Sequence, residues 1–494
     1  MKKNKVIVIG AGFAGLAASS LLVQAGFDVT VLEKNSTPGG RARKFSENGF
    51  TFDMGPSWYW MPDVFEKFFA LFNKTPEDYY QLQRLDPSYR FYFGKDEIVD
   101  VPATFSEIVD IFEKEETGAG DALIKFLKEA EYKYNVSMSK FVYKSGISVF
   151  EFAHPEMLAS VFKLHMFRSF DKHLKHHFKS ARLRQMLEFP ILFLGGTAKS
   201  TPALYSLMNY GDIKLGTWYP VGGMYKVVEG MVELATSLGV KFVYNSPVES
   251  FEFENDKITA VHAAGKRFET PYVLASADYQ YVEQSLLPAE YRSYTKKYWN
   301  SRVLSPSSLI FFLGIDKKLE GIEHHTLFFD QDFSKHADAI YDKPDWPENP
   351  SLYFSCTSKT DPTVAPEGME NLFVLIPVAT GLEDTEETRE KYFQIVLERF
   401  KNLTGQEISE NIVFKRSYAH ADFESDYHAF KGNAYGLANT LMQTAFLKPK
   451  MRSKKVSNLF YTGQLTVPGP GVPPALISGE IAAKLILKDA GIEG

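Results

Sequence analysis

The sequence predicts an α/β fold in which a discontinuous domain built on a βαβ unit is joined to a second domain of mixed sheet and helices. Three observations support this prediction. β-Branched runs at Lys5–Ile9 and Asp28–Leu32 flank an alanine-rich helical segment at Ala14–Ala25, which gives one βαβ unit. Further strand and helix patterns recur in the middle and at the end of the chain. A length of 494 residues also exceeds what one ordinary hydrophobic core supports.

The remaining elements follow in order along the chain. Residues 60–130 are predicted to form helices interrupted by a pair of strands in "RLDPSYRFYFGKDEIVDVP", and residues 121–210 to be mostly helical. The stretch from "GVKFVYNS" to "YVLASAD" predicts four strands separated by turns. Strands of a second sheet are expected at "SSLIFFLGID" and "NLFVLIPVA", and a helix at Thr385–Asn402. The chain then closes with a short strand in "NLFYTG" and a helix at Ala475–Lys488.

No low-complexity linker separates these elements, so the chain is expected to cross between its domains several times. We assign residues 1–85, 216–282 and 455–494 to the discontinuous domain. Residues 86–120 and 283–454 are assigned to the sheet of the second domain, and 121–215 to a helical region that faces a membrane.

Composition excludes several functional classes. The net charge of -6 and a pI near 6.1 give no sign of a nucleic-acid partner. Cys356 is the only cysteine, which rules out a disulfide within the chain and a zinc site built on thiolates, and fits a reducing compartment. No stretch of about 18 continuous apolar residues occurs. Any membrane contact is therefore expected to be peripheral.

A glycine fingerprint lies between the first strand and helix. "VIVIGAGFAG" places Gly10, Gly12 and Gly15 in the G-x-G-x-x-G pattern, and an acid follows at Glu33. Gly10 permits a tight turn, Gly12 lets backbone N–H groups approach a pyrophosphate, and Gly15 lets helix and strand pack closely. The alternative, a glycine-rich turn without a ligand, does not explain the complete context. The fingerprint alone does not separate FAD from NAD.

The next stretch favours FAD. "EKNSTPGGRAR" adds Gly39, Gly40 and Arg41 after the second strand, and "GFTFDMGPS" follows. A second glycine pair and an arginine beyond the acid offer further phosphate and flavin contacts. A domain for NAD alone would normally continue with another βα unit.

These segments resemble the start of the flavin amine oxidase and phytoene desaturase superfamily. Three later segments resemble motifs of carotenoid desaturases. Their middle motif is similar to "WYPVGGMYKVVEGMVELATSLGVKF", and their second flavin segment to "PVESFEFENDKITAVHAAGKRFETPYVLASAD". Their C-terminal flavin motif is similar to "NLFYTGQLTVPGPGVPPALISGEIAAKLIL". The resemblance spans nearly the whole chain and is most specific for bacterial-type phytoene desaturases. It implies a discontinuous Rossmann-like FAD-binding domain and a second mixed-sheet and helical substrate domain.

The resemblance also implies site residues. It places the ADP half of FAD on Gly10, Gly12, Gly15 and Glu33, with Gly40 and Arg41 near the pyrophosphate. Gly55, Pro56 and Ser57 would lie along the flavin, and the backbone of Val248 would contact the adenine end. Gly463 and the turn Gly471–Val472–Pro473 would lie at the isoalloxazine ring.

Local physics supports the last of these assignments. "GVPPALISGE" has a glycine, then Pro473 and Pro474, then good helix formers, and proline suits a helix start because its missing N–H costs nothing there. The positive end of that helix can stabilise a reduced, anionic flavin. The alternative is a surface loop before a terminal helix.

The implied reaction removes two hydrogens from a saturated C–C bond next to a polyene, with a hydride passing to the flavin. The first expectation is stepwise desaturation of phytoene towards lycopene. Alternatives are a desaturase, ketolase or isomerase acting on another carotenoid, for example a hydroxylated one, and a flavin-bearing lipid-binding protein without turnover. Quinone or oxygen is expected as electron acceptor. The catalytic residues are unknown; Glu151 and His154 are weak candidates in "SVFEFAHPEMLAS".

The substrate site should be long and apolar. Trp58 and Trp60 follow the expected flavin contacts and are the candidates for its lining. Phe65, Phe68, Phe69 and Phe72 follow with helical spacing, so at least some of them should belong to the core.

Two further patterns allow competing interpretations. Lys163–Arg184 is basic and places Phe167, Phe170, Leu174 and Phe178 on one helical face, so it either lies on an anionic membrane or packs these side chains inward. The membrane interpretation would place the protein in the cytoplasm at the inner membrane. The histidine groups His173/His176/His177 and His324/His325 complete no metal-ligand set in the sequence, so no metal is expected.

Overall fold

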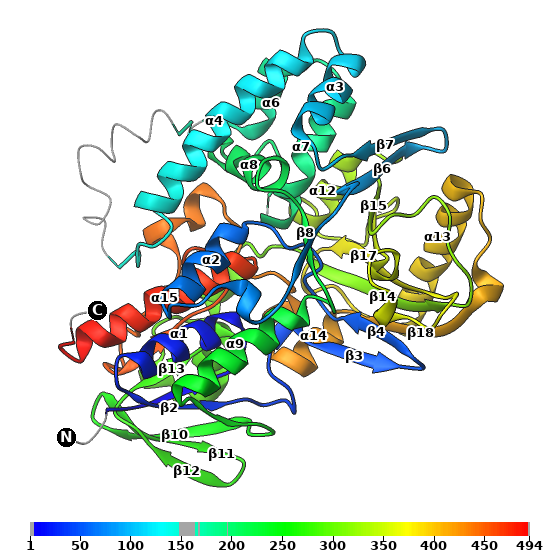
Figure 1. Ribbon diagram of the computed structural model, residues 1–494. Coiled ribbons are helices and arrows are strands. Elements are labelled where there is room, and N and C mark those ends of the chain that lie inside the picture. The colour runs from blue at the N-terminus through cyan, green and yellow to red at the C-terminus, as the bar shows by residue number, and fades with distance from the viewer. Residues whose placement is uncertain (1–3, 148–163, 166–167, 195, 493–494) are drawn as a thin grey trace.

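The computed structural model describes residues 4–147, 164–165, 168–194 and 196–492. Two large sheets, three smaller sheets of two or three strands and a helical region make up the described part of the chain, and both large sheets draw on separated segments (Figure 1). Glu151 and His154 lie outside the described residues.

The first sheet has five parallel strands in the order β19-β13-β1-β2-β9. Their bounds are Leu459–Tyr461, Val273–Ala275, Lys5–Ile9, Asp28–Leu32 and Lys241–Val243. Helices α1 (Phe13–Gln24), α9 (Tyr225–Leu238) and α15 (Val472–Asp489) pack together beside it, and the antiparallel strands β10 (Val248–Glu254), β11 (Lys257–Ala263) and β12 (Lys266–Glu269) lie on its other side (Figure 1). The N-terminal and C-terminal segments thus share one layer.

The helices α1 and α15 approach each other closely because of one glycine. A Cβ at Gly479 of α15 would lie 2.2 Å from the carbonyl oxygen of Ala14 in α1. Only a residue without a side chain lets the first and last helices of the chain meet at this distance.

The second sheet has seven strands in the order β18-β14-β17-β16-β15-β6-β7. Their bounds are Ile412–Tyr418, Ser307–Ile315, Glu370–Val378, Leu352–Ser355, His325–Phe328, Tyr89–Gly94 and Glu97–Val101. Strands β14 and β17 are buried along their whole length. Leu309 and Phe311 of β14 pack on helix α13 (Glu386–Thr404), whereas Ile310 and Phe312 face the opposite core, which includes Phe52.

The helical region contains α3 (Phe105–Glu115), α4 (Ala119–Lys140), α6 (Phe170–His177), α7 (Ala181–Leu194) and α8 (Leu207–Ile213). The basic stretch is therefore two helices with a break between them. Phe170, Leu174 and Phe178 are fully buried and contact the core around Phe126. The idea that this apolar face lies on a membrane is wrong for these three residues, because their side chains stabilise the helical region itself; Phe167 lies outside the described residues.

Most expected elements are present. β1 and β2 have the predicted bounds, and α15 begins three residues before the predicted start because Pro473 and Pro474 stand in its first turn. One strand was missed, since five strands, β9 to β13, replace the four expected. The phenylalanines after Trp60 are core residues: Phe65, Phe68, Phe69 and Phe72 are buried. No helix within the described ranges is long and apolar enough to cross a membrane.

Candidate functional site

A cavity of about 380 Å³ lies where the carboxyl ends of the parallel strands face the second sheet. Fifteen of the sixteen sequence-predicted site residues line it: Gly10, Gly12, Glu33, Gly40, Arg41, Gly55, Pro56, Ser57, Trp58, Trp60, Val248, Gly463, Gly471, Val472 and Pro473. Gly15 is the exception, because it packs against the backbone of Gly10 and not toward the cavity. The cavity therefore unites segments from both chain ends and from the middle.

The first wall is a glycine cradle at the start of α1. Gly10 has a φ of +99°, a conformation that favours glycine, and its N–H donates to the carbonyl of Leu32 at 2.8 Å. A Cβ at Gly15 would lie 2.2 Å from the Gly10 carbonyl oxygen, so Gly15 serves close packing. A Cβ at Gly12 would meet only the Cα of Gly40, at 4.0 Å. Gly12 is thus open toward the cavity and Gly15 is not.

Glu33 is buried at the end of β2. Its carboxylate accepts the backbone N–H of Ala11 at 2.8 Å and that of Asn35 at 2.9 Å. These two bonds aim the carboxylate at the turn between β1 and α1, where the fingerprint places a ribose.

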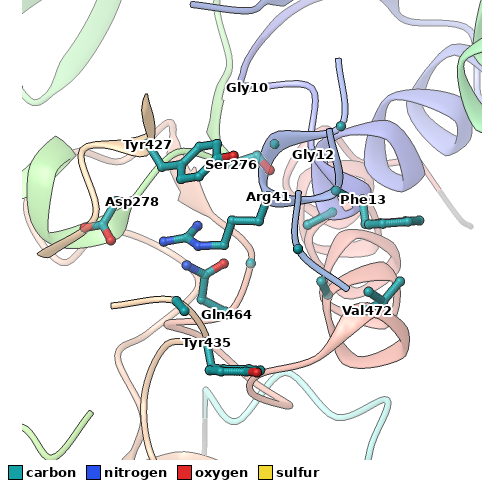
Figure 2. Close-up of a pocket in the computed structure, with 18 of the residues that line it drawn as sticks. Gly10, Gly12, Phe13, Arg41, Ser276, Asp278, Tyr427, Tyr435, Gln464 and Val472 are labelled. Carbon is teal, nitrogen blue, oxygen red and sulfur yellow. The ribbon is translucent and has the colours of Figure 1, made fainter. Parts of the chain in front are cut away.

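Arg41 extends into the cavity between Asp278 and Gln464 (Figure 2). It donates to the carbonyl oxygen of Asn433 at 3.2 Å, and the Gln464 amide, with its oxygen turned toward Arg41, accepts at 2.7 and 2.9 Å. Burial lowers the pKa of Arg41 and raises the pKa of Asp278, while the attraction between the two opposes both shifts. The guanidinium Nε has no partner among the described residues, so the group has capacity left for an anion.

The C-terminal turn forms the opposite wall. Gly471, with a φ of +112°, caps α15, and Val472 and Pro473 face the cavity. Ser478 of α15 accepts the N–H of Gly463 at 2.9 Å and bonds the Thr462 hydroxyl at 2.8 Å. These contacts hold the strand-to-helix connection against the start of the helix.

The far half of the cavity is apolar. Its lining includes Trp58, Trp60, Met61, Pro190, Met208, Ile310, Tyr353 and Leu375. The Trp58 indole stacks on the His325 imidazole with ring centroids 4.0 Å apart, and it lies 5.1 Å from the Trp60 ring.

A chain of hydrogen bonds positions Trp60. Its Nε1 donates to Thr217 Oγ1 at 2.8 Å, and Thr217 donates to Asp212 at 3.4 Å. Tyr89 donates to the other oxygen of Asp212 at 2.7 Å. Burial raises the pKa of Asp212 to about 7.

Sequence reasoning missed several of these groups. Asp278 and Gln464 lie beside Arg41 but come from other segments of the chain. Asp212 positions Trp60 through Thr217, a contact made only in the folded protein. His325 was considered only as a metal ligand, yet its ring forms part of the aromatic wall. Within "LASAD", the acid directly after a buried strand was the available signal for Asp278.

The structure places His173, one of the histidines considered as metal ligands, in a different cluster from the one read in the sequence. Ligand atoms of Glu129, His165 and His173 lie within 4.8 Å of one another. The Lys133 amine lies 3.4 Å from His173 Nε2 and donates to Ala203 and Ser206. A cationic donor thus faces the ring nitrogen that a metal would need.

The cavity fits a flavin dinucleotide. The open backbone at Gly12, the Glu33 carboxylate and the free donor capacity of Arg41 suit a ribose and a pyrophosphate. The start of α15 suits the anionic edge of a flavin ring. Val472 and Pro473 would support that ring, and Val248 would lie at the adenine end.

Comparisons with known proteins agree with this fit. The flavin containing amine oxidoreductase family matches residues 13–487. The chain is 42% identical to a carotenoid 3,4-desaturase of Haloarcula japonica, over 98% of each chain. It is 30% identical to a zeta-carotene-forming phytoene desaturase of Myxococcus xanthus, over 99% of this chain and 95% of that one. A redesigned putrescine oxidase shares the fold, with a TM-score of 0.64 at 16% identity and 99% coverage of both chains.

Proposed function

Because the chain belongs to the flavin-containing amine oxidoreductase family, is an FAD-dependent oxidoreductase and desaturates carotenoids, we propose that it dehydrogenates a linear carotenoid bound in the apolar half of the cavity. The route we propose first is stepwise desaturation of phytoene towards lycopene.

One observation carries the proposal. The glycine cradle and the aromatic wall belong to a single cavity, so a dinucleotide on the cradle and an apolar chain beside Trp58 would meet inside it. A binding protein without turnover would not need that junction. The turn at Gly471–Pro473 lies on the same cavity and supports the assignment of the junction to the flavin ring.

When bound, FAD supplies the two-electron acceptor for a hydride. The protein's own residues bind and orient the substrate. Trp58 and Trp60 offer flat apolar faces to a polyene, and Ile310 and Leu375 from the second sheet face the same space. The developing allylic cation is delocalised over the polyene, so the walls need to exclude water more than to supply charge.

A second candidate is a more unsaturated or hydroxylated carotenoid as substrate. The higher identity to the carotenoid 3,4-desaturase, 42% against 30% for the phytoene desaturase, favours it. The deciding experiment offers phytoene and lycopene separately to the purified, FAD-loaded protein and identifies the products by chromatography and mass. Conversion of phytoene supports the first route. Conversion of lycopene alone supports the second. A third incubation, with a hydroxylated linear carotenoid, tests the other form of the second candidate, and no conversion of any of the three contradicts both candidates.

We propose further that the protein works at the inner membrane from the cytoplasmic side, with quinone or oxygen as the final electron acceptor. Exposed apolar side chains on neighbouring loops support membrane contact: Ile147, Val303, Met442 and Leu447. Lys450 connects these loops by donating to the carbonyls of Gly146 and Phe446 at 2.7 and 2.8 Å. Reduced enzyme mixed separately with a quinone and with oxygen would identify the acceptor by the rate of flavin reoxidation.

A further inference from the structure

A small second cavity adjoins the main one. Its volume is about 20 Å³, enough for one water molecule, and its polar lining includes Asp53, Ser57, Tyr219, Ser355, Thr357 and Asn371. Ser57 also lines the main cavity. This serine therefore stands between the substrate space and a polar, water-sized space.

Hydrogen bonds connect Ser57 to two residues of this wall. Tyr353 lines the main cavity, and its hydroxyl donates to Ser57 Oγ at 2.8 Å. His325 Nδ1 lies 2.7 Å from the same tyrosine oxygen, and burial lowers the pKa of His325 well below its ordinary value. The neutral imidazole can thus donate its Nδ1–H to Tyr353 while Tyr353 donates onward to Ser57.

Asp53 is the carboxylate on the other side of Ser57. It ends strand β4 (Phe50–Asp53) and accepts the backbone N–H groups of Met224 at 2.7 Å and Tyr225 at 3.0 Å. Burial raises the pKa of Asp53 to about 6. Lys44 on β3 (Lys44–Glu47) and Glu229 on α9 also act on it and form a half-exposed ion pair at 3.0 Å. Asp53 therefore lies between the small cavity and groups that water reaches.

We propose that Tyr353, Ser57, one water in the small cavity and Asp53 form a relay that carries away the proton lost by the substrate. The inference rests on the proposed function. Desaturation breaks two C–H bonds, and the hydride from one carbon goes to the bound two-electron acceptor. The C–H bond of the neighbouring carbon then breaks, and its electron pair becomes the second bond of the new double bond.

The released proton goes to the Tyr353 oxygen as the Tyr353 proton moves to Ser57. The Ser57 proton moves to the water, and a water proton moves to the Asp53 carboxylate. Tyr353 already donates to Ser57, so the first transfer follows a hydrogen bond that is present before the reaction. In this relay Tyr353 is the catalytic residue, because it faces the substrate, whereas Ser57 and Asp53 act through it.

The first test measures reduction of the bound flavin by a carotenoid, without oxygen, in H₂O and in D₂O. Wild type is expected to show a solvent isotope effect. Tyr353→Phe and Ser57→Ala should reduce flavin about 10- to 100-fold more slowly and lose that effect, since general base assistance contributes at least this much. Tyr435→Phe removes a different hydroxyl from the main cavity and should retain the isotope effect.

The outcomes separate the relay from the proposed function. If wild-type flavin is not reduced by any carotenoid, the proposed function is wrong. If wild-type flavin is reduced, but Tyr353→Phe matches wild type in rate and in isotope effect, the relay is wrong and the function stands.

A second measurement needs no turnover. Infrared titration of the FAD-free protein should show a protonated carboxyl band that grows as the pH falls through about 6 and is missing in Asp53→Asn. Ser57→Ala should shift the frequency or midpoint of that band. If Ser57→Ala leaves the Asp53 band unchanged, Ser57 and Asp53 are not connected. This holds even if the band is missing in Asp53→Asn.

Discussion

The two halves of the cavity are built in opposite ways. The cradle half consists largely of backbone from short contiguous motifs, with Gly10 and Gly12 at one strand end and Gly471 at a helix start. The apolar half consists of side chains from the segment around Trp58 and Trp60 and from β14, β16, β17, α7 and α8, which come from widely separated parts of the chain. A ligand with phosphates demands N–H groups at fixed spacing, and short motifs can provide these. A hydrocarbon forms no hydrogen bonds and needs only a cavity of matching shape, which side chains from distant segments of the chain form together.

The largest expected effect separates packing from binding within the cradle. Gly15→Ala places a Cβ against the Gly10 carbonyl oxygen at 2.2 Å, where backbone cannot move aside. We expect a loss of roughly 5 kcal/mol in the free energy of unfolding, at the upper end for one substitution. Denaturation of the FAD-free protein measures it.

Gly12→Ala is the matched control for that substitution. Its Cβ meets only Gly40, at 4.0 Å, so the unfolding midpoint of the FAD-free protein should stay close to that of wild type while FAD affinity falls. Equal destabilisation by the two alanines would contradict the division of labour between these glycines.

The apolar half should respond to pH through Asp212. Its folded pKa of about 7 lies above the unfolded value near 4, so the folded protein binds the proton more tightly. The contribution of Asp212 protonation to the free energy of unfolding is fully present below pH 4. It falls by up to about 4 kcal/mol as the pH rises to 7. Asp212→Asn should remove that part of the decline in the unfolding free energy.

Asp96→Asn, in the exposed turn between β6 and β7, is the control for the pH experiment and should keep the wild-type profile. An Asp212→Asn profile that is parallel to wild type between pH 4 and 7 would refute the assignment of this titration to Asp212.

The same contrast explains what the sequence could predict. The fold class, the FAD cofactor and the family resemblance are confirmed, because glycine spacing and strand patterns are local signals. The aromatic wall was predicted only at Trp58 and Trp60, which adjoin a motif. His325, Tyr353 and Asp212 could not be placed, since their roles come from pairings across more than a hundred residues. The buried face of α6 was left open because periodicity does not say what covers an apolar stripe.

Arg41 and Trp58 allow a direct test of the two halves against each other. Arg41→Met should weaken FAD binding about 30-fold, because charged hydrogen bonds to phosphate contribute about 2 kcal/mol. Trp58→Ala should leave FAD affinity within twofold of wild type and raise the carotenoid KM. Flavin fluorescence titration measures the first property and steady-state turnover the second. Loss of FAD affinity in both variants would show that the halves are not independent.

The smallest expected effect concerns how the carotenoid passes from a membrane to the cavity. If the loops around Met442 and Leu447 contact lipid, Met442→Glu should reduce co-sedimentation with anionic liposomes about fivefold, since a buried apolar side chain contributes on the order of 1 kcal/mol. Val413→Glu is the control, because Val413 is also apolar and exposed but lies on edge strand β18 of the second sheet. FAD content should be unchanged in both variants, as the cradle half takes its ligand from water. Equal loss of liposome binding in the Val413 variant would mean that added negative charge alone repels the membrane, and these loops would then have no special part in substrate delivery.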